Sequence, residues 1–331
     1  MTKGILERLA EGPVLGDGGY LLELEKRGYV QAGPFTPEVS ITHPSALLEL
    51  HREFLYAGAD VLQALTFYAS EEKLATVGLS GKTDEINAAA VEIARQAASE
   101  GDALVAGNLT LTWSYDPADP ASFDRVREQF DRQLEDQMSK GIDFVICETY
   151  SYAGEAVIAT ERAKKTGLPV MTTMSFMNEP RSEEGDSPAD CAKRLVDAGA
   201  DIVGVNCLRP PEHTLPLAIE MRGAVPGAYV AAQPVAYRTP AERPDFTSLP
   251  QFPYDLDPLQ LTRKDFADYA KQALDAGIDY IGACCGAVAE HVRAMAKAIG
   301  RLPSQEREWR SPTGKPMSGY EYYGHEEKEP G

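Results

Sequence analysis

The chain has 331 residues, enough for one large domain or two ordinary ones, with 51 acidic and 32 basic residues and a formal net charge of −19. This balance excludes nucleic-acid and anionic-membrane surfaces, because both require basic patches. Five cysteines are too few and odd in number for a disulfide framework, and no apolar stretch approaches the roughly 18 residues of a membrane span. A cytoplasmic protein is therefore predicted.

Strand and helix patterns alternate along the chain. Short apolar runs predict eight strands, at 13–16, 60–68, 103–109, 143–147, 169–176, 201–207, 228–233 and 280–285. The segments that follow them predict helices up to residue 27 and at 45–57, 83–99, 121–140, 154–165, 188–198, 213–222, 263–276 and 288–299. Near-continuous apolar strands that alternate with helices are typical of a parallel sheet.

A local signal repeats in three of these units. A helix ends in glycine and the next strand opens two residues later, at Gly141-Ile142-Asp143, Gly199-Ala200-Asp201 and Gly277-Ile278-Asp279. Each glycine fits a helix C-cap. Eight units favour a (β/α)₈ barrel over an open doubly wound sheet. We expect the barrel to span residues 1–302 and the polar tail 303–331 to contact an oligomer partner or to be partly disordered.

In a (β/α)₈ barrel the carboxyl ends of all strands meet at one mouth, where the chemistry takes place. The polar or sulfur-bearing residues predicted to share this mouth are Asp17, Thr66, Glu148, Cys207, Gln233, Cys284 and Cys285.

Three of the five cysteines end two of the predicted strands. Three thiolates would suit Zn²⁺ with a fourth position open for a substrate. Successive strand side chains point to opposite faces, so Cys284 and Cys285 reach one metal only if the backbone turns, which Gly286 permits. The alternatives are a small core residue at Cys207 and a redox dithiol at the pair, although the pair is not Cys-x-x-Cys and suits disulfide geometry poorly.

Three motifs carry a resemblance to a known family. They are Asp17-Gly18-Gly19, Gly204-Val205-Asn206-Cys207 and Gly282-Ala283-Cys284-Cys285-Gly286. With these motifs the chain resembles the homocysteine S-methyltransferase family, and within it the betaine-dependent members. Further matching segments occur at 3–9, 24–30, 32–34, 51–55, 66–70 and 101–107, and the likeness extends to about residue 302.

The resemblance implies that Cys207, Cys284 and Cys285 hold Zn²⁺ and that the homocysteine sulfur takes the open position. Coordination deprotonates a thiol at neutral pH, which creates a nucleophile for a methyl group bonded to positive nitrogen or sulfur. Glu148 would bind the homocysteine amino group, and Asp17 with the Gly18 backbone would help to position the same substrate.

The resemblance also implies residues around the methyl donor. Tyr68 matches an aromatic residue that faces the donor. Thr66 and Gln233 lie at strand ends in matching motifs and are further candidates for substrate binding, without assignment to the donor. Phe35 stands where betaine-dependent members carry tryptophan, and Thr149 stands where they carry tyrosine. An onium ion is held by aromatic faces. We therefore hypothesise that neighbouring aromatic residues rebuild the donor cage, with Trp113 foremost, and with Tyr115, Tyr150 and Tyr152.

The expected function is zinc-dependent transfer of a methyl group from glycine betaine or a related onium to homocysteine, giving methionine. Alternative donors are dimethylsulfoniopropionate, S-methylmethionine or a corrinoid. A barrel that binds zinc or a ligand without catalysis is the non-enzymatic alternative, and a zinc hydrolase is disfavoured because three thiolates make zinc a poor Lewis acid. A homo-oligomer is expected. Whether the proline-rich loop from Thr239 is a lid stays open.

Overall fold

Eight parallel strands form the centre of the molecule. The structure is a computed structural model that describes residues 3–302 together with 313, 315 and 319. The strands are β1 (Val14–Leu15), β2 (Val61–Gln63), β3 (Leu104–Thr110), β4 (Phe144–Tyr150), β5 (Val170–Met174), β6 (Ile202–Asn206), β7 (Tyr229–Gln233) and β8 (Tyr280–Ile281). Their order in the sheet is β1-β8-β7-β6-β5-β4-β3-β2. The seam between β1 and β2 is bridged by the Asp60 amide, which donates to the Leu15 carbonyl oxygen at 2.8 Å. The predicted (β/α)₈ barrel is confirmed.

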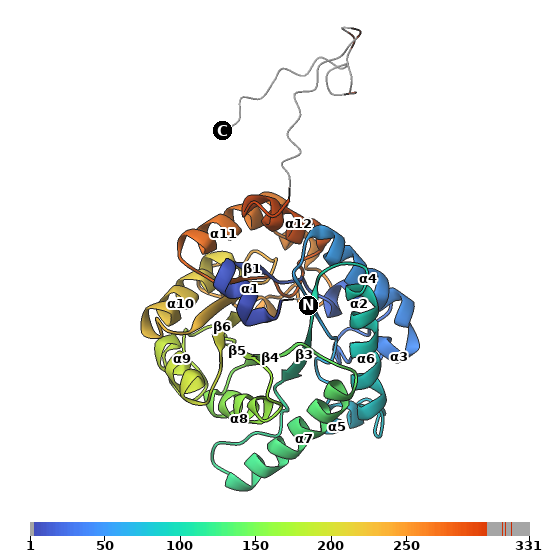
Figure 1. The fold of residues 1–331 in the computed structure, drawn as a ribbon, viewed down its shortest axis with the longest axis vertical. Coiled ribbons are helices and arrows are strands. Elements are labelled where there is room, and N and C mark those ends of the chain that lie inside the picture. The colour runs from blue at the N-terminus through green and yellow to red at the C-terminus, as the bar shows by residue number, and fades with distance from the viewer. Residues whose placement is uncertain (1–2, 303–312, 314, 316–318, 320–331) are drawn as a thin grey trace.

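Helices surround the strands in a ring, as Figure 1 shows in a view along the barrel. They are α1 (Ile5–Glu11), α2 (Leu21–Lys26), α3 (Val39–Thr42), α4 (Pro44–Ala57), α5 (Glu71–Ala75), α6 (Thr83–Ala98), α7 (Pro120–Ser139), α8 (Ala153–Lys164), α9 (Pro188–Asp197), α10 (Pro211–Ala224), α11 (Arg263–Asp275) and α12 (Ala289–Ala298). Two 3₁₀ helices, Phe246–Ser248 and Asp257–Leu259, lie in the loop after β7. None of the helices in residues 3–302 is long and apolar enough to cross a membrane.

The barrel has an inner and an outer core. Inward-facing strand residues such as Phe144 and Tyr280 pack with Ile5 and Leu9 of α1, so this helix closes the N-terminal end of the barrel. The outer core joins the other faces of the strands to the surrounding helices. With both faces of each strand buried, the near-continuous apolar runs of the sequence are explained.

The repeated Gly-x-Asp signal has a structural role at the N-terminal face of the barrel. The aspartate carboxylate accepts a hydrogen bond from a backbone N–H near the start of the preceding strand, as in Asp60 with Leu15 (2.8 Å), Asp143 with Val105 (2.7 Å), Asp201 with Val170 (2.8 Å) and Asp279 with Val230 (2.7 Å). Each carboxylate also pairs with a basic side chain, respectively Arg301, Arg95, Lys164 and Arg222. This arrangement satisfies polar groups at the strand starts and helps to set strand register. A fourth copy, Gly58-Ala59-Asp60, joins the three predicted from sequence.

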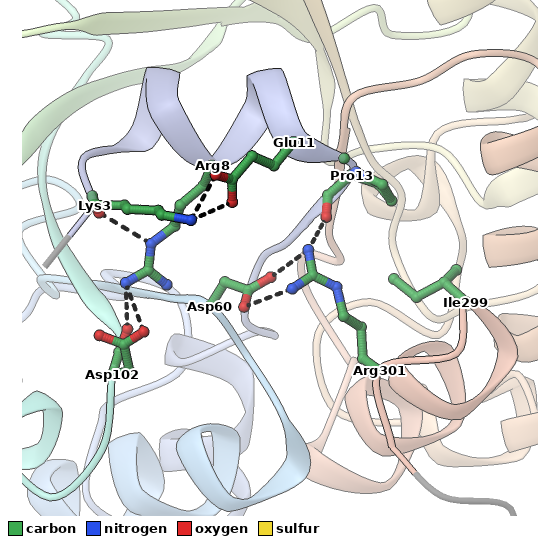
Figure 2. Close-up of a pocket in the computed structure, with 9 residues that line it drawn as sticks. Lys3, Arg8, Glu11, Pro13, Asp60, Asp102, Ile299 and Arg301 are labelled. Carbon is green, nitrogen blue, oxygen red and sulfur yellow. Dashed lines mark hydrogen bonds and ion pairs between the residues drawn. The ribbon is translucent and has the colours of Figure 1, made fainter.

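A groove of about 820 Å³ lies at this N-terminal face, beside α1. Figure 2 shows that its charged side chains point toward one another. Lys3 pairs with Glu11 at 2.5 Å, Arg8 with Asp102 at 3.2 Å and Arg301 with Asp60 at 3.4 Å. Because these charges neutralise one another, the groove offers no concentrated charge to a ligand.

The strand boundaries differ from prediction at the mouth. β2 ends at Gln63, because the chain turns at Thr66, whose amide donates to the Ala64 carbonyl oxygen at 2.8 Å, and at Tyr68, which has φ 60°. β8 ends at Ile281, so Cys284 and Cys285 lie in a loop. β4 instead continues through Glu148 to Tyr150, with an irregularity in its pairing with β5. The predicted tail 303–331 lies outside the described residues except for 313, 315 and 319.

Candidate metal centre and substrate site

Three cysteine sulfurs converge at the carboxyl end of the barrel. The Sγ atoms of Cys207, Cys284 and Cys285 all lie within 4.8 Å of one another, and those of Cys207 and Cys285 are 3.5 Å apart. A tetrahedral zinc ion with Zn–S bonds of about 2.3 Å separates its sulfur ligands by a little under about 4 Å. The three sulfurs therefore fit a tetrahedral metal site with one further position.

The backbone turns that bring the sulfurs together are visible on both sides. Cys207 follows β6 with a positive φ of 58°, and Gly286 has φ 80°. A Cβ atom at Gly286 would overlap the ring of Tyr237. Only glycine fits this turn, which lets Cys284 and Cys285 face one centre as the sequence predicts.

Hydrogen bonds among the three thiols shift their pKa values in opposite directions. Hydrogen bonds from Cys284 and Cys285 lower the pKa of the Cys207 thiol well below its usual value. The hydrogen bond to Cys207 raises the pKa of Cys284 and of Cys285. Without a cation only one thiolate is favoured, since three buried negative charges would repel one another. A divalent cation would supply the compensating charge.

Glu148 is a buried carboxylate that is held by amide side chains from three strands. Its Oε1 accepts hydrogen bonds from Gln63 Nε2 at 2.6 Å and Asn108 Nδ2 at 2.8 Å, and its Oε2 accepts one from Asn206 Nδ2 at 2.9 Å. Burial, reinforced by the nearby Cys207, raises the pKa of Glu148 to about 8. A cationic ligand group would offset that cost, so the site is suited to an ammonium.

Asp17 is a second buried carboxylate at the mouth. Its Oδ2 accepts hydrogen bonds from the Tyr20 hydroxyl at 2.5 Å and from the backbone N–H of Gln63 at 2.7 Å. The Tyr20 hydroxyl also lies 2.9 Å from His51 Nδ1. Burial raises the pKa of Asp17 to about 6 and lowers that of His51 to about 3. The neutral imidazole and the phenol therefore fix the carboxylate without neutralising it.

The carboxylates and the thiols border one cavity. Its lining includes Asp17, Gly18, Gln63, Phe67, Glu148, Cys207, Gln233, Cys284 and Cys285. Gln233 Oε1 is buried without a hydrogen-bond partner in the described part of the chain, so it keeps an acceptor free. Thr66 does not line this cavity. Its hydroxyl donates to the Asn108 carbonyl oxygen at 2.8 Å, which gives it a structural role.

The predicted donor-side aromatic residues separate into distinct groups. Phe35 packs in the same apolar cluster as Cys207 and Phe252. Tyr68 contacts Phe67, with ring centroids 4.2 Å apart, and Trp113, at 5.7 Å.

Tyr150, hypothesised from sequence to help rebuild the donor cage, belongs to β4 and packs edge-on against Phe130 in the core. The structure therefore contradicts its assignment to the cage. Tyr115 stacks on Phe123 and contacts Tyr152.

Several site residues were missed from sequence. Asn206 and Asn108 are strand residues that hold Glu148, and Asn206 also binds the amide and hydroxyl of Thr149 at 2.9 and 2.8 Å. A signal existed for Asn206, because a polar side chain directly before Cys207 interrupts an apolar strand. No comparable signal marks Tyr20 or Phe252, which reach the site only through the fold.

Comparisons with known proteins agree with this geometry. The family model described as homocysteine S-methyltransferase matches residues 14–299. The chain is 47% identical over 309 residues to betaine–homocysteine S-methyltransferase 1 of Mus musculus, a match that covers 90% of this chain and 75% of that protein. It is 42% identical over 307 residues to the S-methylmethionine–homocysteine S-methyltransferase BHMT2 of Pongo abelii, covering 90% and 81%.

Among solved structures, the metallated form of the homocysteine methyltransferase MmuM from Escherichia coli matches with a TM-score of 0.69 at 22% identity. The match covers 88% of this chain and 99% of that chain and supports the barrel fold. The family match over 14–299 and the sequence identities above 40% show that the chain belongs to the homocysteine S-methyltransferase family.

Proposed function

We propose that this protein transfers a methyl group from a small onium donor, glycine betaine or a related betaine, to the sulfur of homocysteine, giving methionine. The observation that carries the proposal is the convergence of three cysteine sulfurs on a cavity that Glu148 and Asp17 also line. Such a cavity accommodates both ends of an amino-acid thiol.

We infer that the metal is Zn²⁺, held by Cys207, Cys284 and Cys285, because an all-thiolate donor set and a tetrahedral spacing favour this ion. Bound there, Zn²⁺ would keep the homocysteine sulfur deprotonated at neutral pH.

The protein's own residues hold the rest of homocysteine. The Glu148 carboxylate, oriented by its three amide donors, accepts hydrogen bonds from the substrate ammonium. Asp17 and the Gly18 backbone position the same amino acid. At Gly18 a Cβ atom would lie 2.6 Å from the Phe54 ring, so glycine is needed for this approach. The two carboxylates thereby hold the amino-acid end, which leaves the sulfur end for the cysteines that line the same cavity.

The methyl transfer is a direct displacement. The homocysteine sulfur forms the new S–C bond while the bond from the methyl carbon to the onium atom breaks, and the electron pair of that bond leaves with the neutral amine. Opposite charges disappear in the transition state, so a site that excludes water favours the reaction. Phe35 and the loop that carries Phe252 cover the cysteines with apolar side chains. Their covering position supports a water-excluding role.

The test is methionine formation by zinc-loaded protein with homocysteine and one donor at a time. The panel contains glycine betaine, dimethylsulfoniopropionate and S-methylmethionine. Turnover with glycine betaine is expected, and Cys285→Ser should abolish it in parallel with zinc loss. Zinc-loaded protein that makes no methionine with any donor would contradict the proposal and favour a corrinoid donor or a binding role.

A sulfonium donor is the second candidate. The 42% identity to an S-methylmethionine–homocysteine S-methyltransferase favours retaining it, and Phe35 and Thr149 are the residues to which a changed donor preference would be assigned. The cytoplasmic location, a homo-oligomeric state and the division into a barrel of 1–302 and a tail of 303–331 stay predictions.

A further inference from the structure

A single ammonium group lies against an aromatic pair at the barrel mouth, formed by Tyr68 and Trp113. Lys73, on α5, places its Nζ 4.9 Å from the ring centroid of Tyr68 and 4.6 Å from that of Trp113. The two rings meet edge to face, with centroids 5.7 Å apart. Cations are attracted to aromatic faces at such distances. The pair therefore already serves as a cation site, with a cation supplied by the protein.

Lys73 has no carboxylate partner in residues 3–302, since none of the ion pairs there includes it. Partial burial lowers its pKa, the direction expected for an ammonium without a neighbouring anion. Neighbouring Glu72 is engaged by the Ser114 hydroxyl. The three N–H donors of Lys73 are thus available to an incoming anionic group.

The aromatic pair is held in a costly backbone conformation. Tyr68 has φ 60° and Trp113 has φ 68°, a region that bulky residues seldom occupy. Such strain persists where the surrounding structure imposes it, and it concentrates at ligand sites. Both residues follow strands at the barrel mouth, Tyr68 after β2 and Trp113 after β3.

Tyr68 connects Lys73 to the cysteine centre. Its ring contacts Phe67, which lines the cysteine cavity. The Tyr68 ring thus lies between Phe67, at the cysteine cavity, and the Lys73 ammonium, which is 4.9 Å from the ring centroid.

Two cations cannot share one aromatic face without repulsion. An onium group is then favoured on the cysteine side, where Phe67 lines the cavity and Phe35 packs in the apolar cluster of Cys207. A donor whose onium lies there would extend its other end toward the Lys73 ammonium. We propose that Lys73 binds the carboxylate of the methyl donor and so selects onium compounds that carry a carboxylate over bare onium cations. This inference rests on the proposed methyl transfer and names a donor class for it.

The test compares two sulfonium donors that differ in the carboxylate. Dimethylsulfonioacetate carries one and trimethylsulfonium does not, while the methyl group leaves from sulfur in both. The kcat/KM for dimethylsulfonioacetate divided by that for trimethylsulfonium is measured for wild type, Lys73→Met and Lys73→Arg. A charged hydrogen bond predicts that Lys73→Met lowers the ratio about 10-fold or more. The KM for homocysteine should stay unchanged, and Lys73→Arg should keep most of the ratio.

The exposed Lys82, which pairs with Glu85, provides a matched control, and Lys82→Met should leave the ratio as in wild type. An unchanged ratio in Lys73→Met would overturn the proposal. An equal gain in kcat/KM with both donors would also overturn it, because Lys73 would then be a cation that competes with the onium.

Failure of the underlying methyl transfer has a separate signature. Wild-type protein would then form no methionine with any onium donor. In that case calorimetric binding of N,N-dimethylglycine still tests Lys73, since weaker binding to Lys73→Met supports a carboxylate site and equal binding overturns it.

Discussion

The two ends of the barrel differ in how they treat charge and backbone strain. At the N-terminal face the aspartates of the Gly-x-Asp repeats pair with basic side chains, and glycine takes the left-handed positions. At the mouth, non-glycine residues adopt positive φ, and those in the described chain are Phe35, Tyr68, Trp113, Thr149, Cys207 and Leu208. The N-terminal face pairs its charged side chains, whereas the mouth holds residues in strained backbone conformations.

The polar groups show the same difference. Val105 N and Asp143 satisfy each other at the N-terminal face, but near the mouth Gln233 Oε1 and the Tyr237 hydroxyl are buried without a hydrogen-bond partner in the described residues. Burial also raises the pKa values of Asp17 and Glu148 there. The N-terminal face therefore stabilises the barrel, whereas the mouth retains unpaired polar groups that a metal and a substrate would satisfy.

The largest effect is expected from Cys284→Ser. A full zinc site is worth about 10–16 kcal/mol, so one sulfur among the ligands accounts for roughly 3 kcal/mol, or more than a hundredfold in zinc affinity. Metal content should fall below one ion per chain and methionine formation should be lost, while circular dichroism stays that of the folded barrel. Full zinc retention would show that Cys284 is not a ligand.

Glu148→Gln should act on substrate binding. The variant offers the substrate ammonium no carboxylate, and its amide NH₂ would face either the Asn206 donor or the Gln63 and Asn108 donors. Loss of a charged hydrogen bond predicts a rise of about 10- to 100-fold in the KM for homocysteine. Glu100→Gln, at a surface ion pair, serves as the control. An unaltered KM in Glu148→Gln would argue that the substrate ammonium lies elsewhere.

Asp17→Asn should weaken homocysteine binding and increase the free energy of unfolding at neutral pH. Because the pKa of Asp17 is raised from 3.8 to about 6, the folded state keeps a proton that the unfolded state loses. The free energy of unfolding therefore falls as pH rises from 3.8 to about 6, by up to about 3 kcal/mol.

Asparagine can accept the same hydrogen bonds from Tyr20 and Gln63 and does not ionise. Urea unfolding should show that Asp17→Asn is more stable than wild type at pH 7.5 and similar to it at pH 3.5, with weaker homocysteine binding at pH 7.5. A variant less stable than wild type at pH 7.5 would contradict the inference that the buried Asp17 charge destabilises the folded protein.

The smallest effect, and one confined to stability, is expected at the N-terminal face. Asp143→Ala leaves the Val105 amide without its acceptor and removes the Arg95 ion pair. The free energy of unfolding should fall by about 1–3 kcal/mol. The KM for homocysteine and the zinc content should not change. A large change in either would contradict the inference that the N-terminal face contributes to stability alone.

Most of the fold could be predicted from sequence because both faces of each strand are buried. Apolar runs and glycine caps identified eight strand–helix units and the Gly-x-Asp repeat. The predictions failed at strand ends near the mouth, where the sequence stays apolar although the backbone leaves the sheet, as between Thr66 and Tyr68 and before Cys284. Periodicity reports burial, and these loops are buried as well.

The sequence by itself determined the composition of the site: three cysteines that follow two of the strands, a glycine that permits their turn, and the carboxylates of Asp17 and Glu148. Only the tertiary structure decided how these groups are held. Gln63 and Glu148 are 85 positions apart and meet at 2.6 Å, and Lys73 meets the ring of Trp113, a residue that follows a different strand. Such contacts depend on barrel closure, because hydrogen bonds and cation–π contacts act over a few ångströms that no local pattern specifies.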